Sequence, residues 1–361
     1  MHRRGEAAVV GGGLAGLWVS YELLRRGYRV TLYESHEIGY GASSRAAGII
    51  SLQLPRSLLP YAIEGIKSYA ELGVERMADT LWIPRASEFH CAARIADELR
   101  SRGLYAEAAE IDDVKVKFRV TGNGERVILM KQGVANPSDA ISSLMKRLGD
   151  MGGLNVVSGP VYVKDGKLYY NGSPVDHDLK FIAAGPWSAS LLPSVSGKLK
   201  TYRCSAHSVR GDGWVPKFIL EDDRGGFYVT PESDSQVIIG GGDAPLVSPD
   251  DGFAVSKYEA YDVLEAVASR MPEANAYYPV SSWAAPCVSA MDGMPVVGEL
   301  DGVYVITGLN GAGLTLSPGL SALVVDIAEG VAEEPEALSP RRLLRENLKG
   351  PEEPFDRICD P

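Results

Sequence analysis

Three glycines near the N-terminus, Gly11, Gly13 and Gly16, have the spacing of a turn that can bind a diphosphate. They follow an uncharged apolar run at residues 7–10, which is typical of a strand buried in a parallel sheet. Residues 14–21 come next, and their apolar side chains recur at helical spacing. Gly11 permits the tight turn, Gly13 lets the backbone approach the diphosphate, and Gly16 lets the helix pack closely. The free N–H groups and positive dipole end of the helix would hold the negative charge.

An acidic residue completes this first group. A second apolar run at residues 30–33 predicts the next strand, which ends at Glu34. A carboxylate there would accept hydrogen bonds from the hydroxyl groups of an adenosine ribose, and it would repel a 2′-phosphate, which disfavours NADP. Taken alone, three glycines and an acid also fit a flexible turn. Because strand, turn, helix, strand and acid follow one another in a single βαβ unit, the sequence predicts a dinucleotide site.

Small residues around a single cation form a second group at residues 41–50, GASSRAAGII. The hydroxyl groups of Ser43 and Ser44 and the charge of Arg45 suit phosphate oxygens, and residues 46–50 are small enough to lie flat against a ring system. The alternative interpretation is a helix N-terminus capped by Ser43, with Arg45 on the surface.

A third group lies at residues 303–330, where a strand VYVIT runs into the glycine-rich turn GLNGAG and then into a helix. Ser317 and Pro318 suit the first positions of that helix, and Gly330 suits its end. The sequence therefore predicts a second helix N-terminus that opens onto a glycine-lined pocket.

Composition limits the classes of partner. The chain has 361 residues, 45% of them hydrophobic and 23% charged, as in an ordinary globular protein with about two domains. The net charge of −11 argues against nucleic acid as the main partner, because phosphate binding needs a basic surface. The first predicted strand begins at Ala7, so we expect no signal peptide, and the chain has no apolar run long enough to span a membrane. Attachment to a membrane surface stays open.

The cysteines indicate the compartment. Cys91, Cys204, Cys287 and Cys359 are far apart in the sequence and form no CxxC motif or Cys/His cluster. This spacing fits a reducing cytoplasm and does not fit a zinc site, and we expect no bound metal. Glutamine occurs only at positions 53, 132 and 236, and the scarcity of thermolabile side chains hints at a thermophile.

The middle of the chain differs in character from the opening βαβ unit. Residues 115–120, KVKFRV, alternate polar and apolar side chains, which predicts a half-buried antiparallel strand. Residues 226–242 predict a hairpin, and residues 138–148 and 250–270 predict helices. We therefore expect a second, strand-rich domain that begins near residue 80.

With these segments in hand, the chain resembles the flavin-dependent family of D-amino acid oxidase, glycine oxidase, sarcosine oxidase and the related amino-acid dehydrogenases. The matching segments are VVGGGLAG with Glu34, ASSRAAG, GVANP at residues 133–137, AAGPW at 183–187, the hairpin FYVTP to IIGGG, MDGMPVVG at 291–298, and GLNGAGLTLSPG. Their order and spacing carry the resemblance. Nicotinamide-dependent flavin reductases usually have a second GxGxxG and a CxxxxC pair, and this sequence has neither.

The resemblance implies an α/β fold with two parts. A Rossmann-like FAD-binding domain would comprise residues 1–80, 131–201 and 289–345. A substrate-binding α+β domain, built on a mixed or antiparallel sheet, would comprise residues 81–130 and 202–288, and residues 346–361 would form a tail.

The resemblance also implies noncovalently bound FAD. Some relatives attach FAD through Cys or His, but here Ser44 is followed by Arg45 rather than His, and Cys287 lies closer to Asp292 than the flavin-linked cysteine does. The residues that match FAD contacts of the family are Gly11, Gly13, Leu14, Ala15 and Gly16 at the diphosphate, Glu34 and Ser35 at the ribose, Ser43, Ser44 and Arg45 at phosphate and ribityl oxygens, Val161, Gly185 and Trp187 at the adenosine half, and Gly48, Gly308, Gly311, Ala312, Gly313, Leu314 and Thr315 at the flavin ring.

In this family the flavin takes a hydride from the carbon that bears an amine, and water hydrolyses the resulting imine. Tyr228 matches a tyrosine that lines the substrate pocket, so it is the candidate catalytic residue, and Ile50 and Cys287 are the other candidate substrate contacts. The alternative for Tyr228 is a hairpin tyrosine with an exposed hydroxyl group. Relatives usually have a carboxylate-binding arginine where this chain has Cys287. Either Arg203, Arg45 or Arg85 replaces that arginine, or the substrate is not a simple amino acid.

We therefore predict FAD-dependent oxidation of an amine or amino acid, with dehydrogenase activity slightly preferred over oxidase activity. The alternatives are oxidation of a 2-hydroxy acid or glycerol phosphate, or a flavin subunit that passes electrons to a partner subunit. The electron acceptor is open between a quinone, a dye-like carrier and oxygen. We expect a cytoplasmic protein, with attachment to the inner face of the membrane as the alternative.

Overall fold

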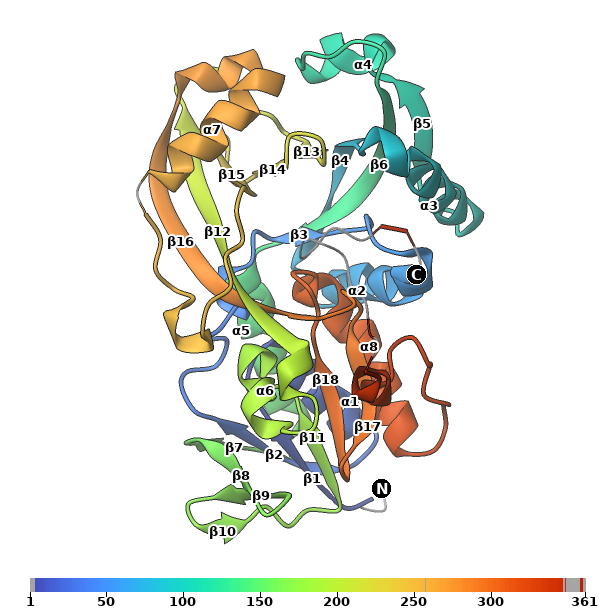
Figure 1. Cartoon of the computed structure of the whole chain (residues 1–361), viewed down its shortest axis with the longest axis vertical. Helices are drawn as coiled ribbons and strands as arrows, with labels where there is room; N and C mark the ends of the chain where they lie inside the picture. The colour runs from blue at the N-terminus through green and yellow to red at the C-terminus, as the bar shows by residue number, and fades with distance from the viewer. Residues whose placement is uncertain (1–3, 257, 347, 349–357, 360–361) are drawn as a thin grey trace.

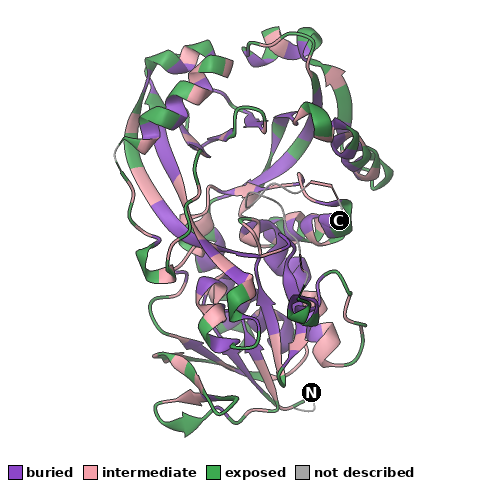
Figure 2. Cartoon of the chain, viewed as in Figure 1, coloured by how far each residue is buried: buried purple, intermediate pink, exposed green. Residues whose placement is uncertain are grey.

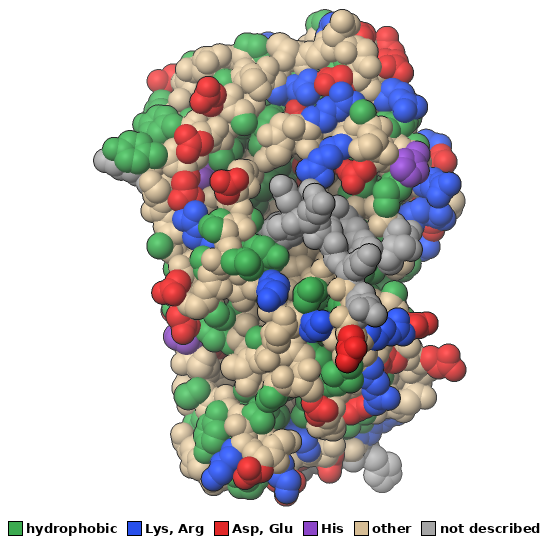
Figure 3. Space-filling model, in the orientation of Figure 1, with side chains coloured by type: hydrophobic (Ala, Val, Ile, Leu, Met, Phe, Trp, Pro, Cys, Tyr) green, Lys and Arg blue, Asp and Glu red, His purple; other side chains and the backbone are tan. Residues whose placement is uncertain are grey.

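Two large sheets lie at opposite ends of the long axis of the molecule (Figure 1). The computed structural model describes residues 4–256, 258–346, 348 and 358–359. The strands inside both sheets are largely buried (Figure 2). On the face that Figure 3 displays, acidic side chains lie among the basic ones over α3 (Phe89–Ser101). Among the described residues, no helix combines the length and apolar composition needed to cross a membrane.

The six-stranded sheet contains the first and last strands of the chain. Its order is β17 (Val296–Leu300), β18 (Val303–Thr307), β11 (Leu179–Ile182), β1 (Glu6–Val10), β2 (Arg29–Glu34) and β7 (Leu154–Ser158). All neighbours pair in parallel except β17 with β18. Ala7 and Val9 face a core that includes α1 (Leu14–Arg25) and α8 (Gly313–Ala328), and Ala8 and Val10 face a second core. The prediction of a doubly buried parallel strand at residues 7–10 is confirmed.

The nine-stranded sheet is mixed. Its order is β16 (Tyr277–Ala290), β12 (Leu199–Gly211), β15 (Gln236–Gly241), β14 (Phe227–Pro231), β13 (Ile219–Asp222), β4 (Glu75–Ile83), β6 (Arg126–Ala135) and β3 (Ile49–Ile50), with β5 (Ala106–Glu110) also on β6. Only β13 and β4 pair in parallel. One face packs with α4 (Ile111–Phe118) and α7 (Glu259–Arg270) in a separate core. The predicted α/β class with a mixed sheet is confirmed, as is the hairpin at 226–242.

The other elements are α2 (Leu59–Glu71), α5 (Pro137–Met151), α6 (Ser188–Leu191) and a small sheet of β8 (Val161–Lys164), β9 (Lys167–Tyr170) and β10 (Ser173–Pro174). Asn136 begins α5, and its side chain accepts hydrogen bonds from the N–H groups of Ser138 and Asp139. Figure 1 shows α2 between the two sheets, with β12 and β16 running from one end of the molecule towards the other.

Four strands cross the predicted domain boundaries. β4, β6, β12 and β16 continue past residues 80, 130, 201 and 288, so the predicted boundaries fall inside strands of the nine-stranded sheet rather than in linkers. The division into FAD-binding and substrate-binding domains stays a prediction. Most of the predicted tail at residues 346–361 lies outside the described residues.

The prediction of a strand at residues 115–120 is wrong. The chain forms α4 there and ends it at Arg119, which has a left-handed backbone. Ile111, Val114 and Phe118 lie on one buried face, with acids in the first turn and lysines in the last. The six-residue alternation was too short to distinguish a strand from this helix.

The predicted start of the last helix is also wrong. α8 begins at Gly313, so Pro318 lies inside it, although Gly330 does follow its end. The proline ring removes one N–H group from the helix, and the Ser317 hydroxyl donates to the carbonyl oxygen of Gly313 at 2.5 Å. The apolar residues on either side keep the helix buried, which outweighs the lost backbone hydrogen bond.

The expectation that the cysteines form no cluster is wrong. Cys91 and Cys359 form a disulfide bond, and His90 Nε2 lies 3.3 Å from the Cys91 sulfur. The ligand atoms of these three residues lie within 4.8 Å of one another, but sulfurs joined to each other offer no thiolate to a metal. Cys204 and Cys287 also meet, on neighbouring strands. Sequence separation hid both contacts because the fold brings distant segments together.

The helices α2 and α8 cross closely because glycines lie between them. A Cβ atom at Gly65 would lie 2.1 Å from the carbonyl oxygen of Thr315, and one at Gly319 would lie 2.7 Å from the Cα atom of Tyr61. Both obstacles are backbone atoms, which cannot rotate away as a side chain can. This contact fixes the position of the first turn of α8.

The substitution Gly65→Ala should therefore destabilise the protein, by about 1–3 kcal/mol in the free energy of unfolding, because it overpacks two backbones. Gly149→Ala in α5 is the matched control, because a Cβ atom there meets nothing within 4 Å. It should raise the free energy of unfolding by up to ~1 kcal/mol, since alanine favours the helix. Chemical denaturation of both variants measures this, and equal effects would contradict the packing argument.

Candidate functional site

A cavity of about 1090 Å³ is lined by residues of both sheets. Its floor is formed by the loops that follow β1, β2, β11 and β18, at the carboxyl edge of the parallel strands. Its roof is one face of the nine-stranded sheet. Ligands of open α/β sheets bind at this edge, so the cavity is the candidate functional site.

The glycine turn lies at one end of the cavity, before α1. Gly11 has a left-handed backbone with φ of 108°, and a Cβ atom on it would lie 2.5 Å from the carbonyl oxygen of Ala183. A Cβ atom at Gly16 would lie 1.8 Å from the carbonyl oxygen of Gly11. The N–H groups of Ala15 and Gly16 are in the first turn of α1, where no intrahelical acceptor exists. The turn therefore presents backbone donors that an anionic ligand can use.

Glu34 lies directly across this turn. Its Oε2 atom accepts a hydrogen bond from the N–H of Gly12 at 2.5 Å, and its Oε1 atom accepts one from the N–H of His36 at 2.8 Å. The carboxylate is thus fixed by backbone groups at the end of β2, beside Ser35. Both side chains line the cavity.

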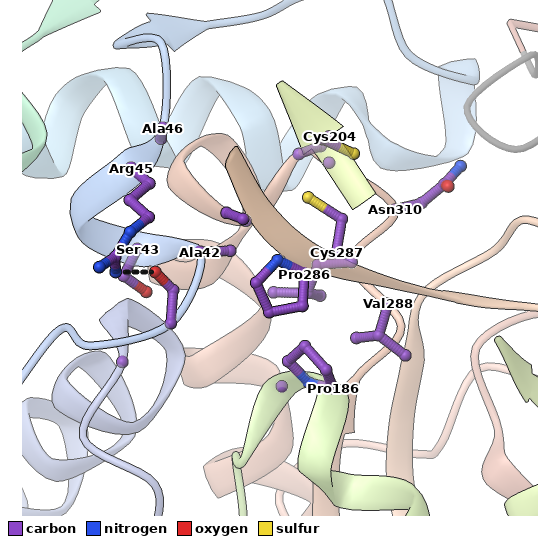
Figure 4. A pocket seen from close by; sticks show the side chains of 18 of the residues that line it. Ala42, Ser43, Arg45, Ala46, Pro186, Cys204, Pro286, Cys287, Val288 and Asn310 are labelled. Carbon is purple, nitrogen blue, oxygen red and sulfur yellow. Dashed lines mark hydrogen bonds between the residues drawn. The ribbon is translucent and has the colours of Figure 1, made fainter. Parts of the chain in front are cut away.

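The loop at residues 41–50 forms one wall (Figure 4). Ser43 begins a short 3-10 turn, and its hydroxyl oxygen accepts from the N–H of Leu14 at 2.9 Å, so it does not cap a helix of its own. The Arg45 guanidinium donates to the carbonyl oxygens of Tyr40 and Gly41 and lies 4.8 Å from the centre of the Phe253 ring. Arg45 is therefore held against its own loop. It lines the cavity, so the alternative interpretation as a surface arginine is wrong.

The N-terminus of α8 opens into the same cavity from the far end of the chain. Thr315 Oγ1 accepts from the N–H of Ser51 at 2.9 Å, which joins the first turn of α8 to the wall at residues 49–51. Two buried polar atoms of cavity residues, Asn310 Oδ1 and Gln53 Nε2, have no hydrogen-bond partner among the residues that the structure describes. Buried polar atoms without a partner are rare, and here they border a space that a polar ligand can fill.

The roof carries a row of polar side chains on neighbouring strands. In register across the sheet are Ala206 on β12, Gly240 on β15, Tyr228 on β14, Glu221 on β13 and Trp82 on β4. Because side chains alternate along a strand, residues in register or two apart point to the same face. Cys204 and Cys287 share this face, and Gln132 shares it on β6.

Tyr228 is not an exposed hairpin tyrosine. Its ring lies across Gly240, where a Cβ atom would come within 2.2 Å of the phenol oxygen. Burial raises the pKa of Tyr228 strongly, and the neighbouring Cys204, Cys287 and Glu221 raise it further. The phenol therefore stays protonated and can donate a hydrogen bond into the cavity.

Cys204 and Cys287 lie side by side in the roof, one on each of the two long strands (Figure 4). Their hydrogen bond is the largest cause that raises the pKa of the Cys204 thiol well above its usual value, and burial adds to it. The Cys204 thiol therefore keeps its proton, and both cysteine side chains are small, weakly polar groups.

Two acids lie at the same end of the cavity. Glu221 is only 8% exposed, and Gln132 Nε2 donates to its Oε1 atom at 3.4 Å. Burial raises the pKa of Glu221 to about 8, and the charge of Asp223 adds to this shift. Burial raises the pKa of Asp223 to about 7, against the hydrogen bond from Trp82 Nε1 at 2.7 Å and the charge of Arg85.

Most residues predicted from the sequence meet at this cavity. The predicted residues that line it are Gly11, Gly13, Leu14, Ala15, Glu34, Ser35, Ser43, Arg45, Gly48, Val161, Gly185, Trp187, Tyr228, Cys287, Gly308, Gly311, Ala312, Gly313, Leu314 and Thr315. Gly16, Ser44 and Ile50 are not among its lining residues. Gly16 packs under the turn, and Ile50 is fully buried against Gly133, while its neighbours Ile49 and Ser51 reach the cavity.

Among the polar lining residues, sequence reasoning missed Gln53, Glu221 and Asp223, whereas Arg85 was one of the predicted candidates for the carboxylate site. The run Phe218–Asp223 offered a signal, because an apolar strand that ends in three consecutive acids must either bury a carboxylate or expose apolar side chains. For Gln53 no local pattern marks a site. Arg203 does not line the cavity, because its guanidinium donates to the carbonyl oxygen of Ala254 and to Glu259.

Comparisons with known proteins agree with this geometry. Residues 6–327 match the DAO family, described as FAD dependent oxidoreductase. Glycine oxidase of Geobacillus kaustophilus is 26% identical, over 91% of this chain and 94% of that protein. Glycine oxidase of Pseudomonas aeruginosa is 26% identical, over 89% of this chain and 94% of that protein.

Solved structures share the fold at lower identity. The crystal structure of the Geobacillus kaustophilus glycine oxidase superimposes with a TM-score of 0.79 at 22% identity and covers 96% of this chain and 100% of that one. L-proline dehydrogenase from P. horikoshii superimposes with a TM-score of 0.80 at 16% identity and covers 95% of this chain and 98% of that one. At these identities the superpositions establish the fold.

The raised pKa of Glu221 makes a prediction for stability. The folded protein holds this proton up to about pH 8, and the unfolded chain releases it near the usual value of 4.5. Protonated Glu221 therefore causes no loss of stability below pH 4.5. As pH rises from 4.5 to 8, the free energy of unfolding falls by a total on the order of 4–5 kcal/mol. Glu221→Gln, which cannot ionise, should gain stability relative to wild type across this range.

Chemical denaturation between pH 5 and pH 9 measures the difference between the two proteins. Asp79→Asn on β4 is the control, because Asp79 is exposed and its removal should give a difference that varies little with pH. A pH-independent difference for Glu221→Gln would show that Glu221 titrates normally in the folded protein.

Proposed function

The chain belongs to the DAO family of FAD-dependent oxidoreductases, and from this premise we propose how its cavity oxidises an amino acid or a related amine. The family and the glycine oxidase relatives establish FAD as the cofactor and an amine or amino acid as the substrate class. The observation that carries the proposal is the meeting of two helix N-termini in one cavity under a polar sheet face.

The cavity fits FAD along its floor. We assign the diphosphate to the backbone around Gly11, Gly13 and the first turn of α1, where added Cβ atoms would collide with neighbouring atoms. We assign the adenosine ribose to Glu34 and Ser35. The ring would lie towards the first turn of α8, where Asn310 Oδ1 and Gln53 Nε2 lack partners among the described residues. This direction agrees with helix dipoles, since both N-termini favour negative charge.

FAD bound in this cavity would supply the hydride acceptor for the carbon that bears the amine. The residues of this chain bind and orient the substrate against it. Tyr228 offers a phenol that stays protonated, and it can donate to a carboxylate or accept from an amino group. The side chains of the roof would orient the substrate, and this orientation would decide how readily the hydride is transferred.

The carboxylate of an amino acid substrate needs a cation, and Arg85 is our candidate. Cys287 occupies the position where relatives carry an arginine. Arg203 is engaged outside the cavity, and Arg45 is held by the carbonyl oxygens of its own loop. Arg85 lines the cavity beside Asp223, and its Nη1 atom lies 3.9 Å from Glu88 Oε2. Cys287 would then act only as a small group that leaves room for the substrate.

Several finer points stay predictions from the sequence. They are the electron acceptor, a partner subunit, membrane attachment and the cytoplasmic location. The disulfide between Cys91 and Cys359 does not fit the expected reducing compartment in an ordinary organism. It does agree with the predicted thermophilic source, because intracellular disulfides are common in hyperthermophiles.

The test of the proposed function is an anaerobic titration of the FAD-loaded protein. The panel contains D- and L-amino acids, N-methyl amines and hydroxy acids, and the readout is loss of the visible absorbance of FAD. We expect at least one amine or amino acid to remove this absorbance, and admitting air then separates oxidase from dehydrogenase. Loss with hydroxy acids alone would contradict the proposal. Failure of every compound would favour a subunit of a larger complex.

Arg85→Met should weaken binding of ligands that carry a carboxylate and leave simple amines unaffected. A charge-assisted hydrogen bond to a carboxylate is worth about 1.5–3 kcal/mol, so we expect at least a tenfold weaker binding of alanine and lactate. Isopropylamine, which lacks the carboxylate, should bind to Arg85→Met as tightly as it binds to the wild-type protein. Arg102→Met, just after the end of α3, is the control, because Arg102 pairs with Glu98 on the surface. Equal effects on all three ligands would remove Arg85 from the carboxylate site.

A further inference from the structure

The charges at the roof end of the cavity are unusual for a site that binds amino acids only through their carboxylate. Three acids line this end, Glu221, Asp222 and Asp223. Asp222 pairs with Arg270 at 2.6 Å, on the side of the sheet that packs against α7. Asp223 accepts from Trp82 Nε1 and lies near Arg85. Glu221 is the acid whose charge has no such compensation.

Gln132 holds Glu221 in place but brings no positive charge to it. Gln132 accepts a hydrogen bond from the N–H of Leu52 at 2.5 Å, which fixes its amide so that Nε2 points to Glu221 and Thr80. The Gln132 contact, at 3.4 Å, is long for a hydrogen bond. Among the described residues, no Lys, Arg or His forms an ion pair with Glu221 or contributes to its pKa shift.

A buried carboxylate in this position favours a cation from outside the protein. Burying a charge without a partner costs several kcal/mol, which a ligand cation can recover on binding. The cavity borders Glu221 and the adjacent Tyr228, so a small ammonium group can reach both. The neighbouring Cys204 thiol keeps its proton, so it adds no competing charge.

We propose that Glu221 binds the amino group of the substrate, and that the enzyme therefore accepts cationic amines whether or not they carry a carboxylate. This inference rests on the proposed function, because it concerns the same cavity and the same reaction. The amino group is the anchor, Tyr228 and Glu221 are its neighbours, and Gln132 positions Glu221. Arg85 adds affinity only for substrates that have a carboxylate.

The proposal makes amine binding depend on pH. The groups that face Glu221 are Gln132 on β6, Thr80 and Trp82 on β4, Tyr228 on β14, Asp223 after β13, and the thiols of β12 and β16. Of these, Asp223 also titrates near neutral pH. As pH rises from 6 to 8, Glu221 loses its proton and becomes a better partner for an ammonium group. The dissociation constant of an amine should fall over this range.

The experiment uses three ligands with one carbon skeleton: isopropylamine, alanine in both configurations, and lactate in both configurations. Binding to the FAD-loaded protein is followed anaerobically by the change in the visible absorbance of FAD. The proteins are wild type, Glu221→Gln, Glu221→Asp and the surface control Asp79→Asn. FAD content and far-UV circular dichroism of each variant show that it is folded and loaded.

We expect Glu221→Gln to weaken the binding of isopropylamine and of alanine by the same factor, about tenfold or more. The dissociation constant of lactate should stay within about twofold of its wild-type value. Glu221→Asp, which keeps the charge, should retain part of the affinity. The fall in the isopropylamine dissociation constant between pH 6 and pH 8 should disappear in Glu221→Gln. Asp79→Asn should match wild type throughout.

Two results would overturn the proposal. One is unchanged binding of both amines in Glu221→Gln, which would leave Glu221 as a structural partner of Gln132. The other is wild-type protein that binds no amine. The experiment also distinguishes failure of the proposed function from failure of the role of Glu221. Amines that bind through Glu221 but never remove the absorbance of FAD would contradict amine oxidation alone, and oxidation that is unaffected in Glu221→Gln would contradict the role of Glu221 alone.

Discussion

The structure depends on the close packing of two helices from opposite ends of the chain. α1 follows β1 and α8 follows β18, and both N-termini open at the carboxyl edge of the same parallel sheet. The Ser321 hydroxyl donates to the carbonyl oxygen of Ala15 at 3.3 Å, and Gly65 and Gly319 let α2 approach α8 within backbone contact. Without these close contacts the two sets of free N–H groups would not share one cavity, and one extended anionic ligand could not use both.

The roof of the cavity complements this floor. The floor supplies backbone donors and positive dipole ends, which suit the FAD cofactor of this family. The roof supplies side chains on one face of a mixed sheet: two thiols, a protonated phenol and a carboxyl group with a raised pKa. Burial causes most of these shifts, and it also makes each remaining polar group sensitive to the charge of a substrate. In the proposed arrangement, backbone groups would hold the cofactor and a few side chains would set the substrate class.

The sequence predicted the floor better than the roof, and the reason is physical. Gly11, Gly13, Gly16 and Glu34 act within one βαβ unit, so their spacing carries the information. The roof combines β4, β6, β12, β13, β14 and β16, and no local pattern reveals that Glu221 faces Gln132 or that Cys204 meets Cys287. Two other predictions from sequence patterns were wrong for different reasons. KVKFRV fits a strand or a helix equally, and burial of apolar neighbours outweighed the preference of Pro318 for a helix start.

The central claim is that the cavity binds its cofactor through the diphosphate and the adenosine half at α1, as well as through the ring at α8. The most direct measurement is a fluorescence titration of the cofactor-free protein with FAD, FMN and riboflavin. The account predicts that FAD binds at least about a hundredfold more tightly than FMN, since about 2.7 kcal/mol or more comes from groups that FMN lacks. Equal affinity for FAD and FMN would contradict it, because the glycine turn and Glu34 would then contribute nothing to binding.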